Sequence, residues 1–578
     1  MRVHAPAIAL ALLLTGCGST TAGEAETDDG STGTEPTKGS TTASSSAATT
    51  SSTSAEASSD SGTAADDSSS GGSDCATPLE CARQAEDRTA QRLDEVRDDD
   101  GALTEFLTAM PLGGDLHHHL SGSVYAETYL AWAEADGDYC ITESSLALSL
   151  SCGDGNDVPV PTGRRDIYLD VVRAWSMLDF VPSPSESGAD HFFATFSKFG
   201  AISGSRHGLM LADVRRRAAN GNVLYIEPML TSNSTARSLG EDVWASLGGG
   251  SLQPDDFAEF HQAILDDPGF FNARARLTDD VETSENIANA EQNCGTANAS
   301  GGCDVVTRYQ AYISRSGADS GVFAQMVAAY EAAIVEPKIV GLNLVGPEDG
   351  STAMANYDDQ MAMLQYLGEY YEGTSPLRLS LHAGEITAAS IPDGYALDEE
   401  DHIRKAVEIA GTRRVGHGID VNFESDPDGL FDLLRDSGIL VEICFASNDI
   451  ILEVTGPEHP VHDYLARGVP VAIATDDQGV ARSSLVAEFV RGARDQDLTY
   501  AELKQMVRAS IEYSFLPGES FWADAETLEV VGTCAPEEGD TPVTQPPSAA
   551  CEAFLAGSDR ARLQRTLEEQ LERFEAEF

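Results

Sequence analysis

Histidines and carboxylates recur where short apolar stretches of this 578-residue chain end. The first group stands in "GGDLHHHLSG", residues 113–122, which places three of the chain's 12 histidines side by side. Successive side chains of an extended strand point to opposite faces, so His117 and His119 would share one face and His118 would take the other. Two histidines at i and i+2 on one face can bind one metal ion. The alternative interpretation is a polar loop that is rich in histidine.

Four later apolar stretches also end in polar side chains, namely "LVGPE", "LHAGE", "VGHG" and "ATDD". Three histidines and one carboxylate form a competent zinc site with a further position open for water. Zinc lowers the pKa of bound water from about 15.7 towards roughly 7, which provides a nucleophile at neutral pH. The predicted ligands of one zinc ion per chain are His117, His119, His382 and Asp476. His118 would face away from the metal and pack or support a ligand.

The elements that must position these residues follow a repeated strand, loop and helix pattern. Strand-like runs lie at residues 114–119, 222–230, 273–280, 338–346, 377–385, 413–419, 439–447 and 469–477. Eight such units predict an α/β fold, a (β/α)8 TIM-type barrel whose working face is formed by the loops after the strands. The run at 273–280 is the weakest, because Arg274 and Arg276 dilute its apolar pattern. A doubly wound Rossmann-type sheet is the alternative, but no G-x-G-x-x-G follows an early strand.

The remaining segments predict the organisation of the chain. Residues 1–17 read as a signal peptide, and residues 18–74 read as a disordered tether rich in Ser and Thr. The barrel would occupy residues 75–578, with a helical insertion at 120–221 and a second insertion at 284–304. The final residues, "DRARLQRTLEEQLERFEAEF", predict an exposed, charge-rich amphipathic helix.

The N-terminus predicts export. Arg2 precedes an apolar run that is too short to span a membrane, and "LTGC" resembles the lipobox of bacterial lipoproteins. Cys17 would then carry the lipid, although an ordinary secretory signal is the alternative. Gly18 after this cysteine resembles lipoproteins sent to the outer membrane. We therefore expect a protein that is lipid-anchored at the cell envelope, or secreted.

The ten cysteines agree with an oxidising compartment. Cys444 lies in the apolar run "GILVEICFASN", where a buried free thiol is expected. Short separations predict four local disulfides, although eight cysteines formally allow 105 connectivities. The predicted pairs are Cys75 with Cys81, Cys140 with Cys152, Cys294 with Cys303, and Cys534 with Cys551. The absence of C-x-x-C argues against a thiolate zinc site.

The charge balance restricts the partners. Ninety-five acidic residues stand against 36 basic ones, for a formal net charge of −59. Such a chain repels the phosphate backbone of nucleic acids, so nucleic acid is not an expected partner. The only expected membrane contact is the lipid anchor.

The set of stretches resembles the adenosine deaminase family within the amidohydrolase superfamily. "MPLGGDLHHHLSGS" is similar to that family's opening M-P-K-x-x-L-H-x-H-L-x-G, with one extra residue before the leucine. "SLHAGE", "RVGHGI" and "ATDD" match its other signatures in the correct order, and "LVGPE" matches after the fourth strand. The resemblance covers residues 105–515, and the exported form with extra cysteines looks most like the secreted, growth-factor-related branch.

The resemblance implies roles for individual residues in the conversion of adenosine or 2′-deoxyadenosine to the inosine product and ammonia. Glu385 would protonate purine N1 as hydroxide attacks C6, and His417 would orient the water. Asp477 would form a hydrogen bond with purine N7, and the Gly346 backbone N–H would form one with purine N3. Ser121 stands where the family often has an aspartate that contacts the ribose, and Gln478 stands where it often has proline. The small-molecule partner would be a purine nucleoside rather than AMP.

Four other functions compete with this interpretation of the residues. A two-metal amidohydrolase normally needs a bridging lysine after the fourth strand, and "LNLVGPEDG" has none. A cytidine-type deaminase would need P-C-x-x-C, which is absent. A deaminase of another aminopurine stays open. A catalytically silent surface binder is disfavoured because Glu385 and all four ligands are present.

Overall fold

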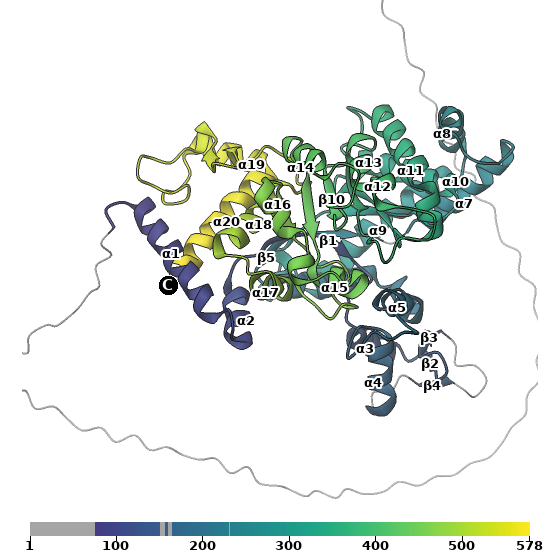
Figure 1. Cartoon of the computed structure of the whole chain (residues 1–578), viewed down its shortest axis with the longest axis horizontal. Helices are drawn as coiled ribbons and strands as arrows, with labels where there is room; N and C mark the ends of the chain where they lie inside the picture. Colours follow the sequence, from purple (N-terminus) through teal and green to yellow (C-terminus); the bar gives the residue numbers. More distant parts are fainter. Residues whose placement is uncertain (1–74, 151–156, 160–164, 231) are drawn as a thin grey trace, which may run out of the picture. The chain divides into compact units, whose positions relative to one another are not determined.

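The computed structural model describes residues 75–150, 157–159, 165–230 and 232–578. Their centre is a barrel of eight parallel strands enclosed by helices (Figure 1). The strands, in their order around the barrel, are β1 (Gly113–His119), β5 (Val223–Met229), β7 (Tyr309–Ser314), β8 (Ile339–Val345), β9 (Arg378–Ala383), β10 (Arg414–His417), β11 (Leu440–Ile443) and β12 (Val471–Ile473). A two-residue strand, β6 (Val306–Thr307), also pairs with β5. The predicted fold class is confirmed.

The barrel closes where the last strand returns to the first. His118 of β1 forms a parallel bridge with Asp476, which follows β12. The Asp476 N–H donates to the His117 carbonyl at 2.8 Å, and the His119 N–H donates to the Asp476 carbonyl at 3.2 Å. The closing contact therefore joins the two chain segments that carry three of the four predicted metal ligands.

The prediction of a third strand at 273–280 is wrong. These residues lie inside helix α9 (Phe270–Glu291). The buried residues of α9 recur every three or four positions, among them Ala273, Leu277 and Val281, which is helical spacing. The third strand is β7, and its buried Gln310 interrupts the apolar pattern of "YQAYIS". The Gln310 amide donates to the Leu116 carbonyl of β1 at 2.9 Å, so this polar side chain is satisfied inside the barrel.

The described part of residues 120–221 lies between the first two barrel strands and is largely helical. Its helices are α3 (Ala126–Asp136), α4 (Arg165–Ala174), α5 (Gly188–Ser203) and α6 (His207–Asn220). The insertion also contains a small antiparallel sheet that the sequence analysis did not predict, formed by β2 (Cys140–Thr142), β3 (Ala147–Ser149) and β4 (Asp157–Pro159). The second expected insertion, 284–304, comprises the end of α9 and the loop closed by Cys294 and Cys303.

The other helices surround the barrel or cap it. They are α7 (Ser234–Ser246), α8 (Phe257–Asp266), α10 (Asp319–Val335), α11 (Ser351–Tyr370), α12 (Leu397–Glu400), α13 (His402–Glu408), α14 (Pro427–Asp436), α15 (Phe445–Leu452), α16 (Val461–Arg467), α17 (Leu485–Asp495) and α18 (Tyr500–Glu512). Helix α10 is buried on nearly all sides, since it packs against α7, α9 and α11 as well as the strands.

The two ends of the described chain meet on one side of the barrel. At the left of Figure 1 the N-terminal helices α1 (Pro78–Val96) and α2 (Asp100–Ala109) lie near the C-terminal helices α19 (Ala549–Gly557) and α20 (Asp559–Glu575). A hairpin of β13 (Trp522–Asp524) and β14 (Glu529–Val530) precedes α19. The expectation of an exposed final helix is wrong, because α20 packs against α18 and α1 and buries one apolar side.

Three of the four predicted disulfides are present: Cys75–Cys81, Cys294–Cys303 and Cys534–Cys551. Cys152 lies outside the described residues, so its pairing with Cys140 stays a prediction. Cys444 is a buried free thiol, as predicted. The predicted signal peptide, Cys17 and the tether also lie outside the described residues.

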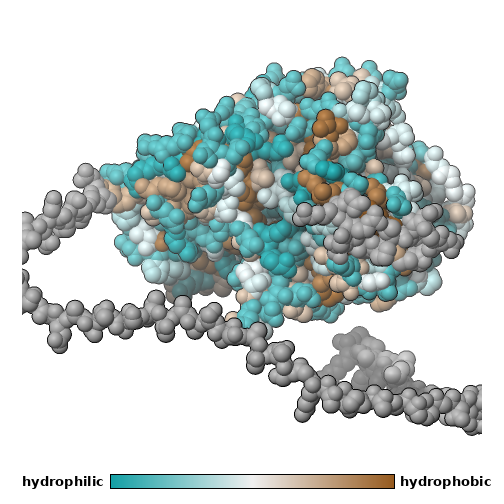
Figure 2. Space-filling view, turned by 90° about the horizontal axis from the view of Figure 1, so that it is seen from below, coloured by the Kyte–Doolittle hydropathy of each residue, from teal (hydrophilic) through white to brown (hydrophobic). Residues whose placement is uncertain are grey.

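One face of the molecule is largely polar. Hydrophilic residues cover most of the face seen in Figure 2, and hydrophobic residues form small separate patches on it. Across the described ranges, no helix is both long enough and apolar enough to cross a membrane.

Candidate metal centre and substrate pocket

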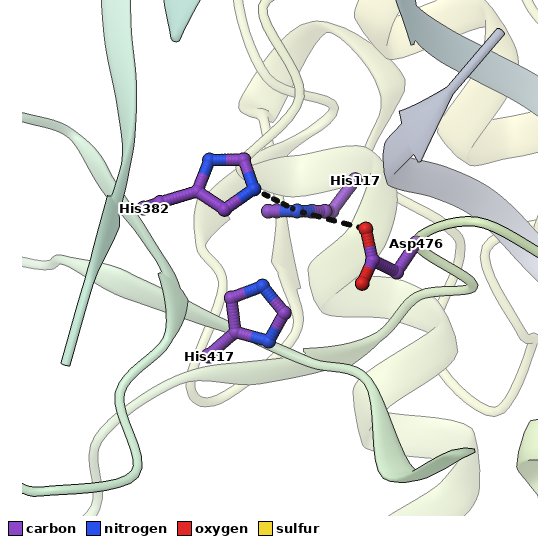
Figure 3. A group of neighbouring side chains, drawn as sticks. All are labelled: His117, His382, His417 and Asp476. Atoms are coloured by element: carbon purple, nitrogen blue, oxygen red, sulfur yellow. Dashed lines mark hydrogen bonds and ion pairs between the residues drawn. The ribbon is translucent and has the colours of Figure 1, made fainter. Parts of the chain in front are cut away.

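The four predicted ligands converge at the carboxyl ends of the strands. The Nε2 atoms of His117 and His382 are 3.0 Å apart, and those of His119 and His382 are 3.3 Å apart. Asp476 Oδ1 lies 3.1 Å from His119 Nε2 and 3.7 Å from His117 Nε2. Figure 3 shows the His117 and His382 rings and the Asp476 carboxylate turned towards one point. The residues come from β1, β9 and the segment after β12, as the sequence analysis expected.

Hydrogen bonds at Nδ1 of His117 and His382 show that the point where their Nε2 atoms meet is suited to a metal ion. His117 Nδ1 lies 2.8 Å from Glu442 Oε2, and His382 Nδ1 lies 2.7 Å from Asn343 Oδ1. Both partners are acceptors, so each Nδ1 carries the hydrogen and each Nε2 of a neutral ring presents a lone pair. Two lone pairs facing each other at 3.0 Å repel unless a cation lies between them. The donor set therefore fits a metal ion, and three imidazoles with one carboxylate suit zinc.

Glu442 is itself held by a buried network. Arg414 Nε donates to Glu442 Oε1 at 2.6 Å, and the Ser380 hydroxyl donates to the same carboxylate. The other side of the Arg414 guanidinium donates to Glu227 at 2.5 Å. Burial alone would raise the pKa of Glu442, but Arg414 and His117 together lower it. Glu442 thus stays ionised and fixes the orientation of the His117 ring.

Two residues of the centre adopt left-handed backbone conformations. The φ angles of His417 and Asp476 are 69° and 55°, in a region that non-glycine residues rarely occupy. Such conformations cost about 1–3 kcal/mol each and persist where the surroundings impose them. The Ser447 hydroxyl donates to Asp476 Oδ2 at 2.6 Å, which leaves Oδ1 turned towards the histidines.

Glu385 and His417, the predicted catalytic pair, lie next to the ligands. Glu385 Oε1 is 3.5 Å from His417 Nε2. Burial raises the pKa of Glu385 well above its ordinary value, and the negative charges of Asp476 and Glu348 raise it further. This environment suits a carboxyl group that holds a proton for transfer.

The loop that carries Glu385 is held by a second carboxylate, Glu348. Its Oε1 accepts the Gly384 N–H at 3.0 Å, and its Oε2 accepts the Glu385 N–H at 2.8 Å. His402 Nδ1 lies 2.7 Å from Glu348 Oε1, and the His402 ring stacks on Tyr357. Burial would raise the pKa of Glu348, but the bond with His402 and nearby charges lower it to about 2. In the sequence, Glu348 is the last residue of the stretch "LVGPE", and that position alone implies no role.

His118 and Asp477 each stand next to a predicted ligand in the sequence, but only Asp477 lies beside the ligands in space. The His118 ring faces away from the cluster, and its Nδ1 lies 2.8 Å from the Ser123 hydroxyl. Asp477 is buried beside the ligands, and burial raises its pKa to about 8. A Cβ at Gly122 would come within 1.4 Å of Asp477 Oδ1, so only glycine fits there.

A cavity of about 350 Å³ opens directly over the centre. Its walls include the predicted substrate contacts Ser121, Gly346 and Asp477, together with Glu385. Aromatic side chains of α5 form part of the lining, and Ile451 of α15 adds an apolar contact. The aromatic residues of α5 at this cavity are Phe192, Phe193 and Phe196. These three residues are not predictable from the sequence, because nothing in the insertion indicates that α5 reaches the barrel mouth.

A second cavity of about 250 Å³ shares four lining residues with the first. The shared residues are His119, Ser121, Phe196 and Tyr312. Ser203 and Ser232 add two further hydroxyl groups. No lysine or arginine is among the described residues that line either cavity. The substrate pocket therefore consists of the first cavity, which lies over the metal ligands, and the second cavity, called the side cavity below, which is lined by hydroxyl groups.

One choice of ligand is left open by distances alone. Ligand atoms of His117, His382, His417 and Asp476 all lie within 4.8 Å of one another, and those of His119, Asp476 and Asp477 form a second such group. His417 could thus take the place predicted for His119. Figure 3 shows the His417 ring beside the His117 and His382 rings, without an interaction drawn to them.

Comparison with known proteins points to a family of deaminases. Residues 267–523 match the adenosine deaminase family. Adenosine deaminase 2 of Dictyostelium discoideum is 33% identical over 177 residues, 30% of this chain and 30% of that protein. Adenine deaminase of Rhizobium leguminosarum is 27% identical over 321 residues, 51% of this chain and 92% of that protein. These matches support the adenosine deaminase family.

The extent of the likeness is limited. The alignments with the first adenosine deaminases, from Dictyostelium discoideum and Clostridium perfringens, span less than half the length of those proteins. Among solved structures, a Burkhoderia ambifaria amidohydrolase with bound Zn is 17% identical, with a TM-score of 0.42. That match covers 81% of this chain and 94% of the other.

Proposed function

We propose that the protein is a zinc-dependent deaminase that converts adenosine and 2′-deoxyadenosine to inosine and 2′-deoxyinosine with release of ammonia. The observation that carries this proposal is the convergence of four metal-ligand side chains with Glu385 and His417. Four of these six side chains, His119, His382, Glu385 and Asp476, line one pocket. The family match supports the same reaction class. A silent binding protein would not need this complete set.

The residues divide the reaction between them. His117, His119, His382 and Asp476 would hold the zinc, which when bound supplies a Lewis acid that makes water nucleophilic near neutral pH. Glu385 would deliver a proton to purine N1 as the water oxygen attacks C6. His417 would hold the water in position. The C6–N bond then breaks, the amino group leaves as ammonia, and C6 keeps the oxygen.

The pocket favours a nucleoside over a nucleotide or a free base. Phosphate is usually recognised by Lys, Arg or a helix N-terminus, and the cavities have no cationic side chain among their described lining residues. A free base would leave the hydroxyl-bearing side cavity empty. Ser121, Ser203 and Tyr312 offer hydroxyl groups there to a ribose. Ser121 is neutral, so its bond to the sugar would be about half as strong as that of a carboxylate.

The decisive experiment is a substrate panel on the zinc-loaded protein. Ammonia release would be followed with adenosine, 2′-deoxyadenosine, adenine and AMP. We expect the two nucleosides to have the highest kcat/KM. Adenine is the second candidate, because the adenine deaminase relative is matched over most of its length. A higher kcat/KM for AMP or adenine would refute the nucleoside assignment, and no ammonia from any of the four would refute deamination of these purines.

We further propose that Cys17 carries a lipid that anchors the protein at the cell envelope. The support is the sequence "LTGC" after a short apolar run, together with disulfides that are typical of exported proteins. Labelling with a radioactive fatty acid should mark the wild type and not Cys17→Ser. Equal labelling of both, or of neither, would contradict the anchor.

A further inference from the structure

His417 can serve the site in two exclusive ways. A neutral imidazole whose Nε2 is bare can bind a metal, whereas one whose Nε2 carries hydrogen can only donate a hydrogen bond there. Distances do not distinguish a metal-binding His417 from a hydrogen-bond-donating one. His417 Nε2 lies among the ligand atoms, and it also lies 3.5 Å from Glu385 Oε1. Among the described residues, His417 Nε2 has no hydrogen-bond partner. A neutral ring carries one hydrogen, so the hydrogen-bonding partner of Nδ1 decides whether Nε2 carries it.

A chain of hydrogen bonds behind His417 runs in one direction only. It begins at the backbone N–H of Val461, which can only donate, and which bonds His459 Nδ1 at 3.2 Å. His459 Nδ1 is therefore an acceptor, so the neutral His459 ring carries its hydrogen on Nε2. That Nε2–H donates to Asn448 Oδ1 at 3.1 Å. The carbonyl end of the Asn448 amide is thereby turned to His459.

The amino end of the same amide must then face His417. Asn448 Nδ2 lies 3.0 Å from His417 Nδ1, and an amide nitrogen can only donate. His417 Nδ1 is therefore the acceptor, and the hydrogen of the neutral ring lies on Nε2. All three side chains of this chain are buried, and Phe445 packs against the His459 ring with centroids 4.9 Å apart. Turning the amide would place its amino group against the His459 Nε2–H, so the hydrogen bond between Asn448 and His459 would be lost.

We infer that Asn448 and His459 are positioning residues that fix His417 as an Nε2–H donor directed towards Glu385 and the metal-ligand atoms. This inference gives His417 its role within the proposed deaminase reaction, and so rests on that proposal. His417 then cannot bind the metal through Nε2, which leaves that place to His119. As a neutral donor it can hold the oxygen of the attacking water but cannot take its proton. Glu385, 3.5 Å away, becomes a carboxylate once its own proton has passed to purine N1, and it is then the neighbouring group that can accept the proton of the water.

The first test is spectroscopic and needs no activity. The ¹⁵N shifts of the His417 ring would be recorded in the zinc-loaded wild type, with His417→Asn used to assign the signal. We expect a protonated Nε2 and a bare Nδ1. In Asn448→Asp the carboxylate has no hydrogen to donate, so Nδ1 should become protonated. A bare or metal-bound Nε2 in the wild type would overturn the inference, as would an Asn448→Asp spectrum identical to that of the wild type.

Kinetics with adenosine separate positioning from general structural damage. Loss of one aligned donor lowers kcat by about 100-fold or more, so we expect that fall in Asn448→Asp, with zinc content kept and KM little changed. His459→Gln keeps an N–H for the Asn448 oxygen and should stay close to the wild type, whereas His459→Leu should not. Equal losses in both His459 variants, or an unchanged kcat in Asn448→Asp, would contradict the inference. If no purine is deaminated, the proposed function fails while the wild-type spectrum still decides the state of His417.

Discussion

At the residue scale, the hydrogen bond at Nδ1 orients the rings of His117 and His118, two of the three residues of the "HHH" stretch. His117 forms a hydrogen bond from Nδ1 to Glu442, and its Nε2 faces the metal centre. His118 forms a hydrogen bond between Nδ1 and the Ser123 hydroxyl, and its ring faces away from the metal centre. Asparagine can reproduce the Nδ1 hydrogen bond of either ring but supplies no Nε2 ligand. Replacing each histidine by asparagine therefore gives a matched pair of variants.

We expect His117→Asn to lose both bound zinc and activity, and His118→Asn to keep most of both. The reason is that the first substitution deletes a ligand atom and the second deletes a nitrogen that faces away from the metal. Metal content after mild dialysis and kcat/KM for adenosine are the measurements, and the wild type should hold about one zinc per chain. Comparable zinc loss in the two variants would show that the alternation along β1 does not select the ligands.

Glu348 should act through the backbone of the loop that carries Glu385. A glutamine at this position keeps one acceptor but turns an amino group towards a second N–H, so one charge-assisted hydrogen bond is lost. Such a bond is worth about 1.5–3 kcal/mol, which corresponds to a fall in kcat of about 10- to 100-fold in Glu348→Gln. Zinc content and KM should change little.

The matched control is Glu424→Gln. Glu424 is also a buried carboxylate that accepts two backbone N–H groups, those of Ile403 and Arg404, but it does not line the substrate pocket. This control should lose stability without a comparable loss of kcat. Similar kinetic losses in both variants would mean that Glu348 matters only for folding.

At the element scale, the sequence predicted the strands whose apolar runs are continuous and missed the one that is not. Seven of the eight expected runs contain a barrel strand, because a strand enclosed by helices is apolar on both sides. The run at 273–280 has a helical period instead, and β7 was hidden by Gln310. The site residues were predictable because they lie at strand ends. Their supports, such as Asn343 and Glu442, lie inside strands, where the pattern shows only an interruption.

Helix α5 supplies a part of the pocket that no barrel strand provides. Phe196 lines both cavities, so its removal would take apolar surface from the bound nucleoside. Burial of a phenylalanine side chain is worth about 1.5–3 kcal/mol, so Phe196→Ala should raise KM for adenosine by about 10- to 100-fold. The value of kcat should change little, because the contact is the same in the ground and transition states.

Steady-state kinetics on Phe196→Ala would be compared with Phe271→Ala, since Phe271 is 64% exposed and does not line the pocket. The control should match the wild type. A fall in kcat with an unchanged KM in Phe196→Ala would show that α5 positions the reacting groups rather than binding the substrate.

At the scale of the whole molecule, the features that sequence reasoning could not reach join segments far apart in the chain. The bonds from Asn448 to His417 and from Glu348 to Gly384 each link different βα units. The contact between α1 and α20 links the two ends of the described chain. Local sequence patterns predict whether a segment is a helix or a strand, but they do not predict which distant segment packs against it. For this reason the final helix was expected to be exposed, although its apolar side is buried.

The packing of α20 predicts a loss of stability without a loss of chemistry. Phe574 is 4% exposed and lies against Phe106 and Tyr500, with ring centroids 5.2 and 6.5 Å away. A buried phenylalanine replaced by alanine costs about 3–5 kcal/mol, so Phe574→Ala should unfold at clearly lower urea concentration. Because Phe574 does not line the substrate pocket, kcat and KM measured well below the transition should match the wild type. Glu577→Ala, three residues further along and exposed, is the control and should leave the unfolding midpoint unchanged. An unfolding midpoint in Phe574→Ala equal to that of the control would show that α20 is as exposed in solution as its charge pattern suggests.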